Sequence, residues 1–511
     1  DQVQITADGT LSNVRMPGIV KGMDLTGGPL SLNVTKDTVQ IAGKAKLDGR
    51  PVTLRWQQYI DTAKAPYDSQ VTAELVADEA LRTRLGVDLD GWLSGAVPVN
   101  VTYTEFPGRR AEAAIQMDIT PATLSLKPFD ATKPPGVSGQ ATALLHLENG
   151  EARDIKELTV QSADMRIEDG TITFRKDSAS GTSGQTTIER GNISRAVFGE
   201  NDFSLMFETT PAGAFKIAID GAFMDARPFL GKDKKGKDKK AKSTDAYEGP
   251  AMVVSVSVAR MRTHTARIVE GAKIYLDRDK TGAIQQLEMD AVAGAGAVYF
   301  RFKPDETGAL ALRFEADDAG AALRAFDLYN NMAGGRLVVA GRAENPATPK
   351  TLKGTVALTD FHVTNAPVLA RILGGLGPTG LSQLLGGEGL YFARLESGFE
   401  WIIRPQGDIH LIRDGRTSGS SLGLTFDGKI DKEAGTTDIE GTIVPMSGVN
   451  EIIGNIPLIG DILAGGRGGA IFAATYAIKG PSAEPTVTVN PLAVLAPGIL
   501  RRILFESDPT P

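Results

Sequence analysis

Apolar and polar residues alternate with a period of two along this chain, from one end to the other. This alternation places successive side chains on opposite faces of a strand, so that one face is apolar and the other is wet. Parallel sheets that are buried on both faces would show continuous apolar runs instead, so antiparallel pairing is favoured. The pattern is clear in segments 99–104, 115–120, 215–220, 254–258, 310–315 and 352–358. The sequence therefore predicts a mainly all-β fold.

Turn signals separate many of the predicted strands. Hairpins favour dipeptides that tolerate a left-handed backbone, and such pairs occur at Asp48-Gly49, Asn149-Gly150, Asp169-Gly170 and Asp414-Gly415. Glycines that point inward from a strand allow a sheet to bend sharply, and an apolar-x-Gly-x-apolar pattern recurs along the chain. These signals predict that the sheet is a long meander.

Helices are expected to be few, short and concentrated toward the C-terminus. Segment 317–332 places Leu323, Phe326, Tyr329 and Met332 at i, i+3 spacing, which makes one amphipathic face. Segments 367–385 and 497–505 are similarly amphipathic. The predicted organisation is β-rich groove repeats over 1–230, a Lys-rich flexible loop over 231–248, further β-rich repeats over 249–430, and a C-terminal segment over 431–511.

The supply of chemically reactive residues is poor. The 511 residues include no cysteine, which excludes disulfides, thiolate nucleophiles and cysteine-based zinc sites. The four histidines, His146, His264, His362 and His410, are far apart in sequence and lie within alternating segments, opposite their apolar neighbours. A net charge of −7 argues against a nucleic-acid partner. We expect that the protein binds no cofactor and is not an enzyme.

Three motif matches lack the context that their chemistry needs. Residues 375–380 have dinucleotide-binding spacing, but no strand leads into them and Pro378 interrupts them. Residues 419–423 match a nucleophile elbow, but an alternating strand pattern follows where a helix is required. Residues 231–238 resemble a P-loop without its Ser or Thr. None predicts a catalytic or nucleotide site.

Segment 232–242 carries seven lysines and two aspartates. It fits either attraction to an anionic lipid surface or partner, or a solvated linker, because lysine tracts without interleaved apolar residues rarely fold. No run of 18 apolar residues is present; the nearest approach, 366–387, contains Arg371 and Pro378. The chain starts at Asp1 without a visible signal peptide, so we expect it to come from a longer protein.

The C-terminal third carries a specific signature. It includes Asp317 to Phe326 followed by Gly334-Gly335, then Asp360-Phe361 and Asn365 to Arg371, and it continues through Gly441 to Pro445, Asn455 to Gly460 and Val489 to Arg501. In these residues the chain resembles the AsmA-like superfamily, particularly its YhdP-type branch, with the TamB type more distant. The match covers about residues 310–505, whereas residues 1–300 are similar only in style.

The resemblance implies a periplasmic protein of Gram-negative bacteria, anchored in the inner membrane by an N-terminal helix that this chain lacks. It implies a long, curved antiparallel sheet that forms an elongated open hydrophobic groove. It also implies a bridge-like carrier that conducts phospholipids along this groove between the inner and outer membranes. Its partners would be phospholipids, the inner membrane through that anchor, and the outer membrane or an outer-membrane protein at the C-terminal end.

Apolar members of the alternating runs are the predicted lining of the groove. A sheet face that no other layer covers must bury its apolar side chains somehow, and acyl chains can do so at about 25 cal/mol per Å2. An ordinary β-sandwich or barrel core would show the same alternation. The predicted lipid-groove residues are Val254, Val256, Val258, Ile274, Leu276, Leu310, Leu312, Phe314, Val356 and Leu358.

The amphipathic segments near the C-terminus are predicted to contact the outer membrane or a partner, because an apolar face flanked by arginines suits an interface. Capping of the sheet end explains them equally well. These residues are Ile372, Leu373, Leu376, Leu381, Leu384, Leu385, Ile499, Leu500, Arg501, Arg502, Ile503 and Leu504.

An alternative function belongs to a different class. An exposed sheet edge could pair with β-strands of client outer-membrane proteins, which would make the chain a periplasmic assembly factor or scaffold. Lipid rather than polypeptide bound to the purified protein would separate the two hypotheses.

Overall fold

The computed structural model describes residues 6–62, 65–87, 89–176, 186–230, 249–264, 266–343, 351–365, 367–374, 389–404, 407–419, 422–445 and 474–490. Of these residues, 71% lie in strands and 6% in helices. The strands form open antiparallel sheet, and the helices are few and short. The predicted fold class is therefore confirmed.

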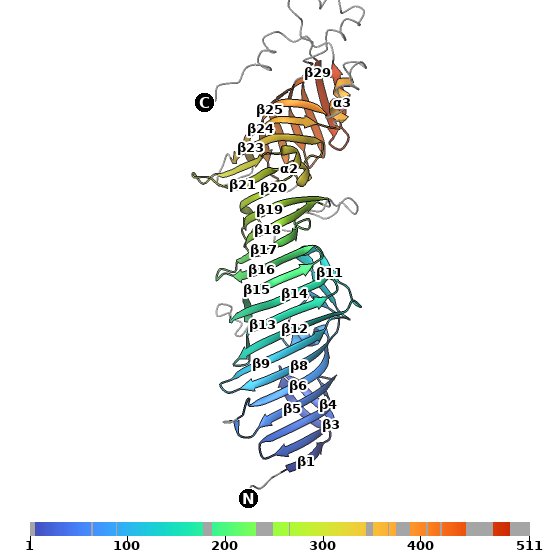
Figure 1. Ribbon diagram of the computed structural model, residues 1–511, viewed down its shortest axis with the longest axis vertical. Coiled ribbons are helices and arrows are strands. Elements are labelled where there is room, and N and C mark those ends of the chain that lie inside the picture. Colours follow the sequence, from blue (N-terminus) through green and yellow to red (C-terminus); the bar gives the residue numbers. More distant parts are fainter. Residues whose placement is uncertain are drawn as a thin grey trace, which may run out of the picture. The chain divides into compact units, whose positions relative to one another are not determined.

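The chain divides into two compact units. Unit 1 comprises Asp1–Asp233 and Met252–Ala259, and unit 2 comprises Lys234–Ala251 and Arg260–Pro511. Within each unit the strands follow one another in chain order (Figure 1). The predicted Lys-rich loop lies outside the described residues, and the predicted four-part organisation stays a prediction.

Unit 1 is a meander in which most strands pair with the strands before and after them, while β1 and β2 both pair with β3, and β9 pairs with β12. Its sheet strands are β1 (Thr6–Leu11), β2 (Val14–Val20), β3 (Met23–Thr35), β4 (Thr38–Leu47), β5 (Arg50–Tyr59), β6 (Ser69–Ala77), β8 (Val97–Phe106), β9 (Arg110–Asp118), β12 (Gly139–Glu148), β13 (Glu151–Ser162), β14 (Met165–Lys176), β15 (Thr186–Phe198), β16 (Asn201–Thr209), β17 (Phe215–Asp225) and the first part of β18 (Met252–His264).

Unit 2 continues the same style of antiparallel pairing, from its first complete strand to its last. Its strands are β19 (Arg267–Arg278), β20 (Ile284–Ala293), β21 (Gly296–Pro304), β22 (Leu310–Ala316), β23 (Met332–Ala343), β24 (Thr351–Val363), β25 (Leu390–Ile402), β26 (Ile409–Ser418), β27 (Leu422–Asp431), β28 (Thr436–Pro445), β29 (Ala474–Pro481) and β30 (Thr486–Asn490).

An accessory layer packs on part of the unit 1 sheet. It consists of α1 (Glu79–Arg84), β7 (Leu93–Ser94), β10 (Thr123–Leu126), η2 (Lys127–Phe129) and β11 (Ala131–Lys133), and β7, β10 and β11 form a small sheet of their own. Leu93 and Ala122 pack with Ala141 and Val160 of the main sheet. Leu81 of α1 packs in a second cluster with Met23 and Ala77.

Two buried cations hold the accessory layer in place. The Lys133 Nζ donates to the carbonyl oxygens of Ile119 and Ala122, at 2.8 and 2.9 Å, and burial lowers the pKa of Lys133. The Arg82 guanidinium donates to the carbonyls of Ala77 and Leu93, at 3.0 and 3.1 Å. Buried donors need such partners, so each cation ties several turns of backbone together.

The helices of unit 2 differ in length from the prediction. Helix α2 spans Ala319–Ala325, and its N-cap, Asp318, accepts a hydrogen bond from the backbone N–H of Ala321 at 2.9 Å. The predicted helix over 317–332 is wrong beyond Ala325, because Asp327 adopts a left-handed backbone, with φ 54°, and Met332 begins β23. Phe326, Tyr329 and Met332 therefore do not share a helical face with Leu323.

Helix α3 spans Pro367–Gly374, within the predicted 367–385 segment. The rest of that segment, and the predicted helix over 497–505, lie outside the described residues. The sequence analysis did not anticipate α1. Its signal was available, since Asp78 accepts from the Leu81 N–H as an N-cap, with an acidic first turn at Glu79.

Several sheet glycines face a phenylalanine on the neighbouring strand. Gly191 pairs directly with Phe207, and a Cβ at Gly191 would lie 2.3 Å from the Phe207 Cζ. Gly415 pairs with Phe426, where a Cβ would lie 2.2 Å from the Cε2. The ring fills the space that the missing side chain leaves, so these positions require glycine because of close packing, with no need for an unusual backbone.

We predict that Gly191→Val destabilises unit 1 by about 2 kcal/mol, because the new methyl groups must displace the Phe207 ring from a packed position. Thermal unfolding followed by circular dichroism measures the effect. Phe207→Ala in the same chain should recover part of the loss.

Gly9→Val serves as the matched control, because it introduces the same side chain at a glycine that no ring covers. Its Cβ would lie 3.8 Å from the nearest side chain, Leu32, in an ordinary van der Waals contact. An equal loss of stability in both variants would contradict the packing account.

Candidate functional site

One face of the unit 1 sheet carries apolar side chains in straight rows that cross the strands. Residues that pair directly across two antiparallel strands point to the same face, so a row can be followed from strand to strand through the register. Row 3 is the longest and takes one residue from each of β4, β5, β6, β8, β9 and β12–β17. It consists of Ile41, Trp56, Val71, Tyr103, Ala113, Leu145, Ile155, Ile172, Gly191, Phe207 and Ile217.

Two parallel rows share this face. Row 1 consists of Ala45, Val52, Leu75, Val99, Met117, Ala141, Val160, Ile167, Ala196 and Phe203. Row 2 lies between rows 1 and 3, and a bulge in β13 divides it into Gly43, Leu54, Ala73, Val101, Ile115 and Ala143, and then Leu158, Gly170, Ile193, Leu205 and Ile219. At about 4.8 Å per strand, a row that crosses eleven strands extends on the order of 50 Å.

Unit 2 has rows of the same kind. Row 4 crosses every strand from β19 to β30 and contains only apolar residues and glycines: Leu276, Leu287, Phe302, Leu312, Gly341, Gly354, Phe399, Ile412, Gly428, Ile439, Ile478 and Val487. Row 5 runs beside it through Ile274, Met289, Phe300, Phe314, Val339 and Val356. Row 6 includes Val298, Ala316, Leu337, Leu358, Leu395, Thr417, Leu424, Ile443 and Ala474.

The rows differ in how far the chain covers them. The accessory layer packs on row 1, where Ala141 is 3% exposed. Most members of rows 3 and 4 are only half-buried, including Trp56, Tyr103 and Phe302. In unit 2, α2 packs mainly on β23, and its Ala319 and Ala322 are fully buried. Each unit thus keeps a strip of apolar side chains that the chain buries only in part, which we call the apolar face.

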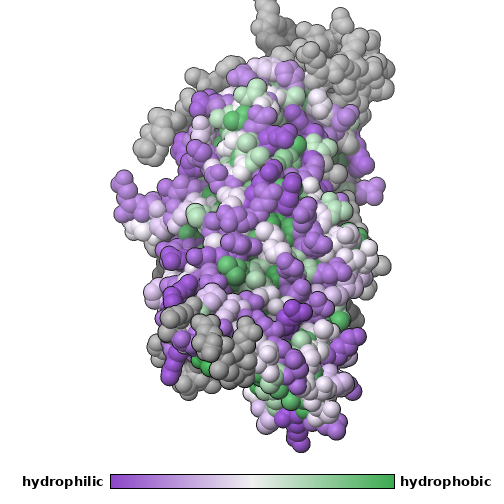
Figure 2. Space-filling model, turned by 60° about the horizontal axis from the view of Figure 1, so that its bottom comes forward, coloured by the Kyte–Doolittle hydropathy of each residue, from purple (hydrophilic) through white to green (hydrophobic). Residues whose placement is uncertain are grey.

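The opposite face of each sheet is polar. In unit 2 its cross-strand neighbours form ion pairs, such as Lys303 with Glu288 at 2.8 Å and Arg416 with Glu396 at 2.8 Å. The hydrogen bond from Lys303 lowers the pKa of Glu288. Exposed pairs of this kind contribute little to stability, but they keep this face hydrated. Hydrophilic residues make up most of the surface in Figure 2, and apolar ones show between them.

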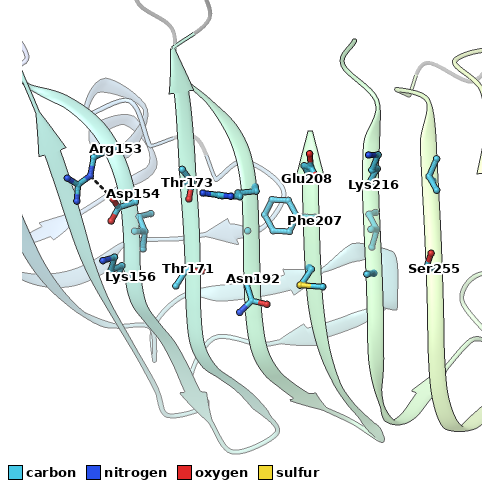
Figure 3. A pocket seen from close by; sticks show the side chains of 17 residues that line it. Arg153, Asp154, Lys156, Thr171, Thr173, Asn192, Phe207, Glu208, Lys216 and Ser255 are labelled. Carbon is cyan, nitrogen blue, oxygen red and sulfur yellow. Dashed lines mark hydrogen bonds and ion pairs between the residues drawn. The ribbon is translucent and has the colours of Figure 1, made fainter. Parts of the chain in front are cut away.

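A hollow in unit 1 is lined mainly by residues whose side chains belong to the polar face. It has a volume of about 860 Å3 and crosses β13 to β18. Figure 3 shows Thr173, Asn192, Glu208 and Lys216 on the successive strands β14 to β17 along it. Four members of row 3, Ile155, Gly191, Phe207 and Ile217, also contribute to its lining, whereas the row 2 members Ile193 and Leu205 do not. A second hollow of about 770 Å3 crosses β4 to β12 and is likewise flanked by polar side chains such as those of Lys44, Glu74 and Asn100.

The structure places the predicted groove residues of unit 2 together on its apolar face. Leu276 and Leu312 belong to row 4, Ile274, Phe314 and Val356 to row 5, and Leu358 to row 6, while Leu310 lies two residues before Leu312 on the same face. Val254, Val256 and Val258 lie in the unit 1 part of β18, where Val256 and Val258 are buried. Contact of any of them with lipid stays a prediction.

Few of the residues predicted to contact a membrane or a partner can be placed. Ile372 lies in α3 and is 1% exposed, so its side chain is part of the packing of unit 2. Leu373 is the next position of α3. Leu376, Leu381, Leu384, Leu385, Ile499, Leu500, Arg501, Arg502, Ile503 and Leu504 lie outside the described residues.

The predicted site omitted the apolar face of unit 1 almost entirely. The signal was present, because Val99-Asn-Val101-Thr-Tyr103 and Ile115-Gln-Met117 alternate in the same way as the segments chosen in unit 2. Alternation identifies which residues share a face of one strand. It does not show that the residues of neighbouring strands lie in register, and the structure adds that information.

His410 lies on the face opposite Ile409 and Leu411, as the alternation predicts, but in unit 2 this is the apolar face and not an outward, polar one. It shares a face with Ile412 of row 4, and its ring stacks on that of Trp401, with centroids 5.9 Å apart. Burial, and after it the charge of Lys432, lowers the pKa of His410. The histidine thus lies on the apolar face in its neutral form, not on the polar face.

This position predicts a pH dependence of stability. Because the folded-state pKa of His410 lies below its unfolded value of about 6.5, the unfolded chain takes up the proton first as the pH falls, and the stability present above that value is lost. His410→Phe keeps the stacking and removes the titration. Between pH 7.5 and 5, its Tm should fall less than that of the unmodified chain; equal falls would refute the assignment.

The described residues show neither a metal-binding cluster nor a membrane-spanning helix. They contain no group of three or more His, Cys, Asp or Glu side chains placed to hold a metal ion. No helix among them is both long enough and apolar enough to cross a membrane. No family model, curated protein or solved structure matches the chain. The AsmA-like resemblance is therefore a prediction.

Proposed function

We propose that this protein binds acyl chains on its apolar face and conducts phospholipids along it, as a bridge-like carrier in the periplasm between the inner and outer membranes. The observation that carries the proposal is the unbroken succession of apolar residues and glycines in rows 3 and 4. The half-buried state of these rows supports it, because such side chains gain from a further apolar cover.

The energetics favour movement along a row. Each methylene that leaves the face for water costs about 0.8 kcal/mol. A chain that slides from Ile155 toward Ile172 and Gly191 exchanges one apolar contact for another, so its free energy changes little. At the glycines no side chain projects from the sheet, so nothing there obstructs the movement of an acyl chain along the row. A continuous row therefore retains a lipid while allowing it to move.

The remaining parts of the proposal rest on the resemblance. We propose that phospholipids enter from the inner membrane, to which an N-terminal anchor in the longer protein would attach the chain, and leave at the outer membrane or an outer-membrane protein near the C-terminal end. No catalytic residue is needed, because the transfer breaks no bond.

The alternative, assembly of outer-membrane proteins by strand pairing, has less support. Edge strands that accept a partner are long and regular. In unit 1, β2 carries Pro17 and shifts register between Met16 and Val20. In unit 2, β30 has only five residues. β2 and the described part of β30 thus have features that discourage pairing, whereas β1 pairs with β3 over six residues without a register shift.

Site-specific crosslinking tests the proposal. The photoreactive p-benzoylphenylalanine should capture phospholipid in cells when it replaces Phe314 in unit 2 or Tyr103 in unit 1, because both side chains lie on the apolar face and both are aromatic already. Mass spectrometry of the crosslinked protein identifies the captured molecule.

The neighbouring residues Arg313 and Thr102 provide matched controls, since they point to the opposite face. Phospholipid captured equally from both faces, or polypeptide captured at Phe314 and Tyr103, would overturn the proposal. Polypeptide captured along β2 or β30 would favour the alternative.

A further inference from the structure

A single carboxylate lies at the margin of the apolar face in unit 1. Glu105 of β8 pairs directly with Ser69 of β6 and follows Tyr103 by two residues, so all three side chains point to the same face. Tyr103 belongs to row 3, and Glu105 begins the next row outward, in which Gln58, Ser69 and Ala111 are its neighbours. Charge thus meets the apolar rows directly at this point.

The carboxylate is held by two neutral donors. The Ser69 hydroxyl donates to Oε2 of Glu105 at 2.8 Å, and the Tyr103 hydroxyl donates to Oε1 at 3.4 Å. Ser69 is only 8% exposed, so the first donor is fixed in the sheet. Burial, and after it the charge of Glu105, raises the pKa of Tyr103, which keeps the phenol protonated as a donor.

No cation of the described chain neutralises Glu105, since none of its lysines, arginines or histidines forms an ion pair with this carboxylate. Glu288, on the polar face of unit 2, is arranged differently, because it accepts from both Lys303 and Arg301, at 2.8 and 3.2 Å. A fixed and uncompensated negative charge beside an aromatic ring is a suitable site for an ammonium group.

We propose that Glu105 and Tyr103 bind the ammonium group of an amine-bearing lipid headgroup while its acyl chains lie on rows 3 and 2. The inference rests on the proposed function and adds to it a selectivity among headgroups. Rows on one face are about 7 Å apart, or two residues along a strand. A lipid on row 3 can therefore reach Glu105, which is exposed to solvent, without drawing its chains off the apolar face.

Glu105→Gln tests the charge with little change in shape, because the amide oxygen can still accept from Ser69. Glu74→Gln is the matched control, since Glu74 is an exposed carboxylate on the opposite face, in the row of Thr53 and Asn100. The purified chain and both variants are incubated with vesicles of equal parts phosphatidylethanolamine and phosphatidylglycerol. Native mass spectrometry then measures which lipid each protein carries.

We expect the unmodified chain and Glu74→Gln to favour phosphatidylethanolamine by about threefold, in line with an exposed ammonium–aromatic and carboxylate contact. Glu105→Gln should carry the two lipids equally. Equal uptake by the unmodified chain, or a preference that survives in Glu105→Gln, overturns the headgroup site and leaves the proposed function standing. If the unmodified chain carries neither of the two lipids, the proposed function is overturned, and the headgroup site with it.

Discussion

The register between neighbouring antiparallel strands is the constraint on which this structure depends. A shift of one residue in any strand would turn its apolar side chains to the polar face. Row 4 continues from Leu276 to Val487 because each strand pairs with the next in a register that keeps its apolar side chains on the same face. Where the register does shift, as in β13 at Glu157, with φ 52°, a bulge restores the apolar face on the following strand.

This register produces two faces of opposite character. The polar face has its own cross-strand hydrogen bonds, such as Thr142 with Thr159 at 2.7 Å and Gln40 with Gln57 at 3.0 Å, and its remaining polar groups can bond to water. The apolar face remains partly exposed to water, because the accessory layer and α2 cover only part of it. An open sheet with a partly covered apolar face needs another apolar body to complete it, which is the physical basis for proposing a lipid as that body.

Close packing within the sheet keeps the apolar rows continuous, whereas buried cations fix the position of the accessory layer. Glycines opposite phenylalanines, as at Gly191 and Gly415, let a ring lie flat against the next strand and keep a row continuous. The accessory layer is fixed through cations in carbonyl cages, of which Lys133 is the clearest. A buried cation without these carbonyls would be costly, so the layer has a specific position on row 1 and leaves row 3 more open.

The sequence by itself determined the fold class, since period-two alternation and turn dipeptides require antiparallel strands whatever their neighbours are. It also determined that the residues of segments such as 310–315 divide between two faces. It did not determine that Leu312 faces Gly341 or that Glu105 faces Ser69, because each of these contacts depends on the register between two strands. The extent of α2, the place of His410 and the cover on row 1 were likewise decided by tertiary structure, since each depends on space left by packed neighbours.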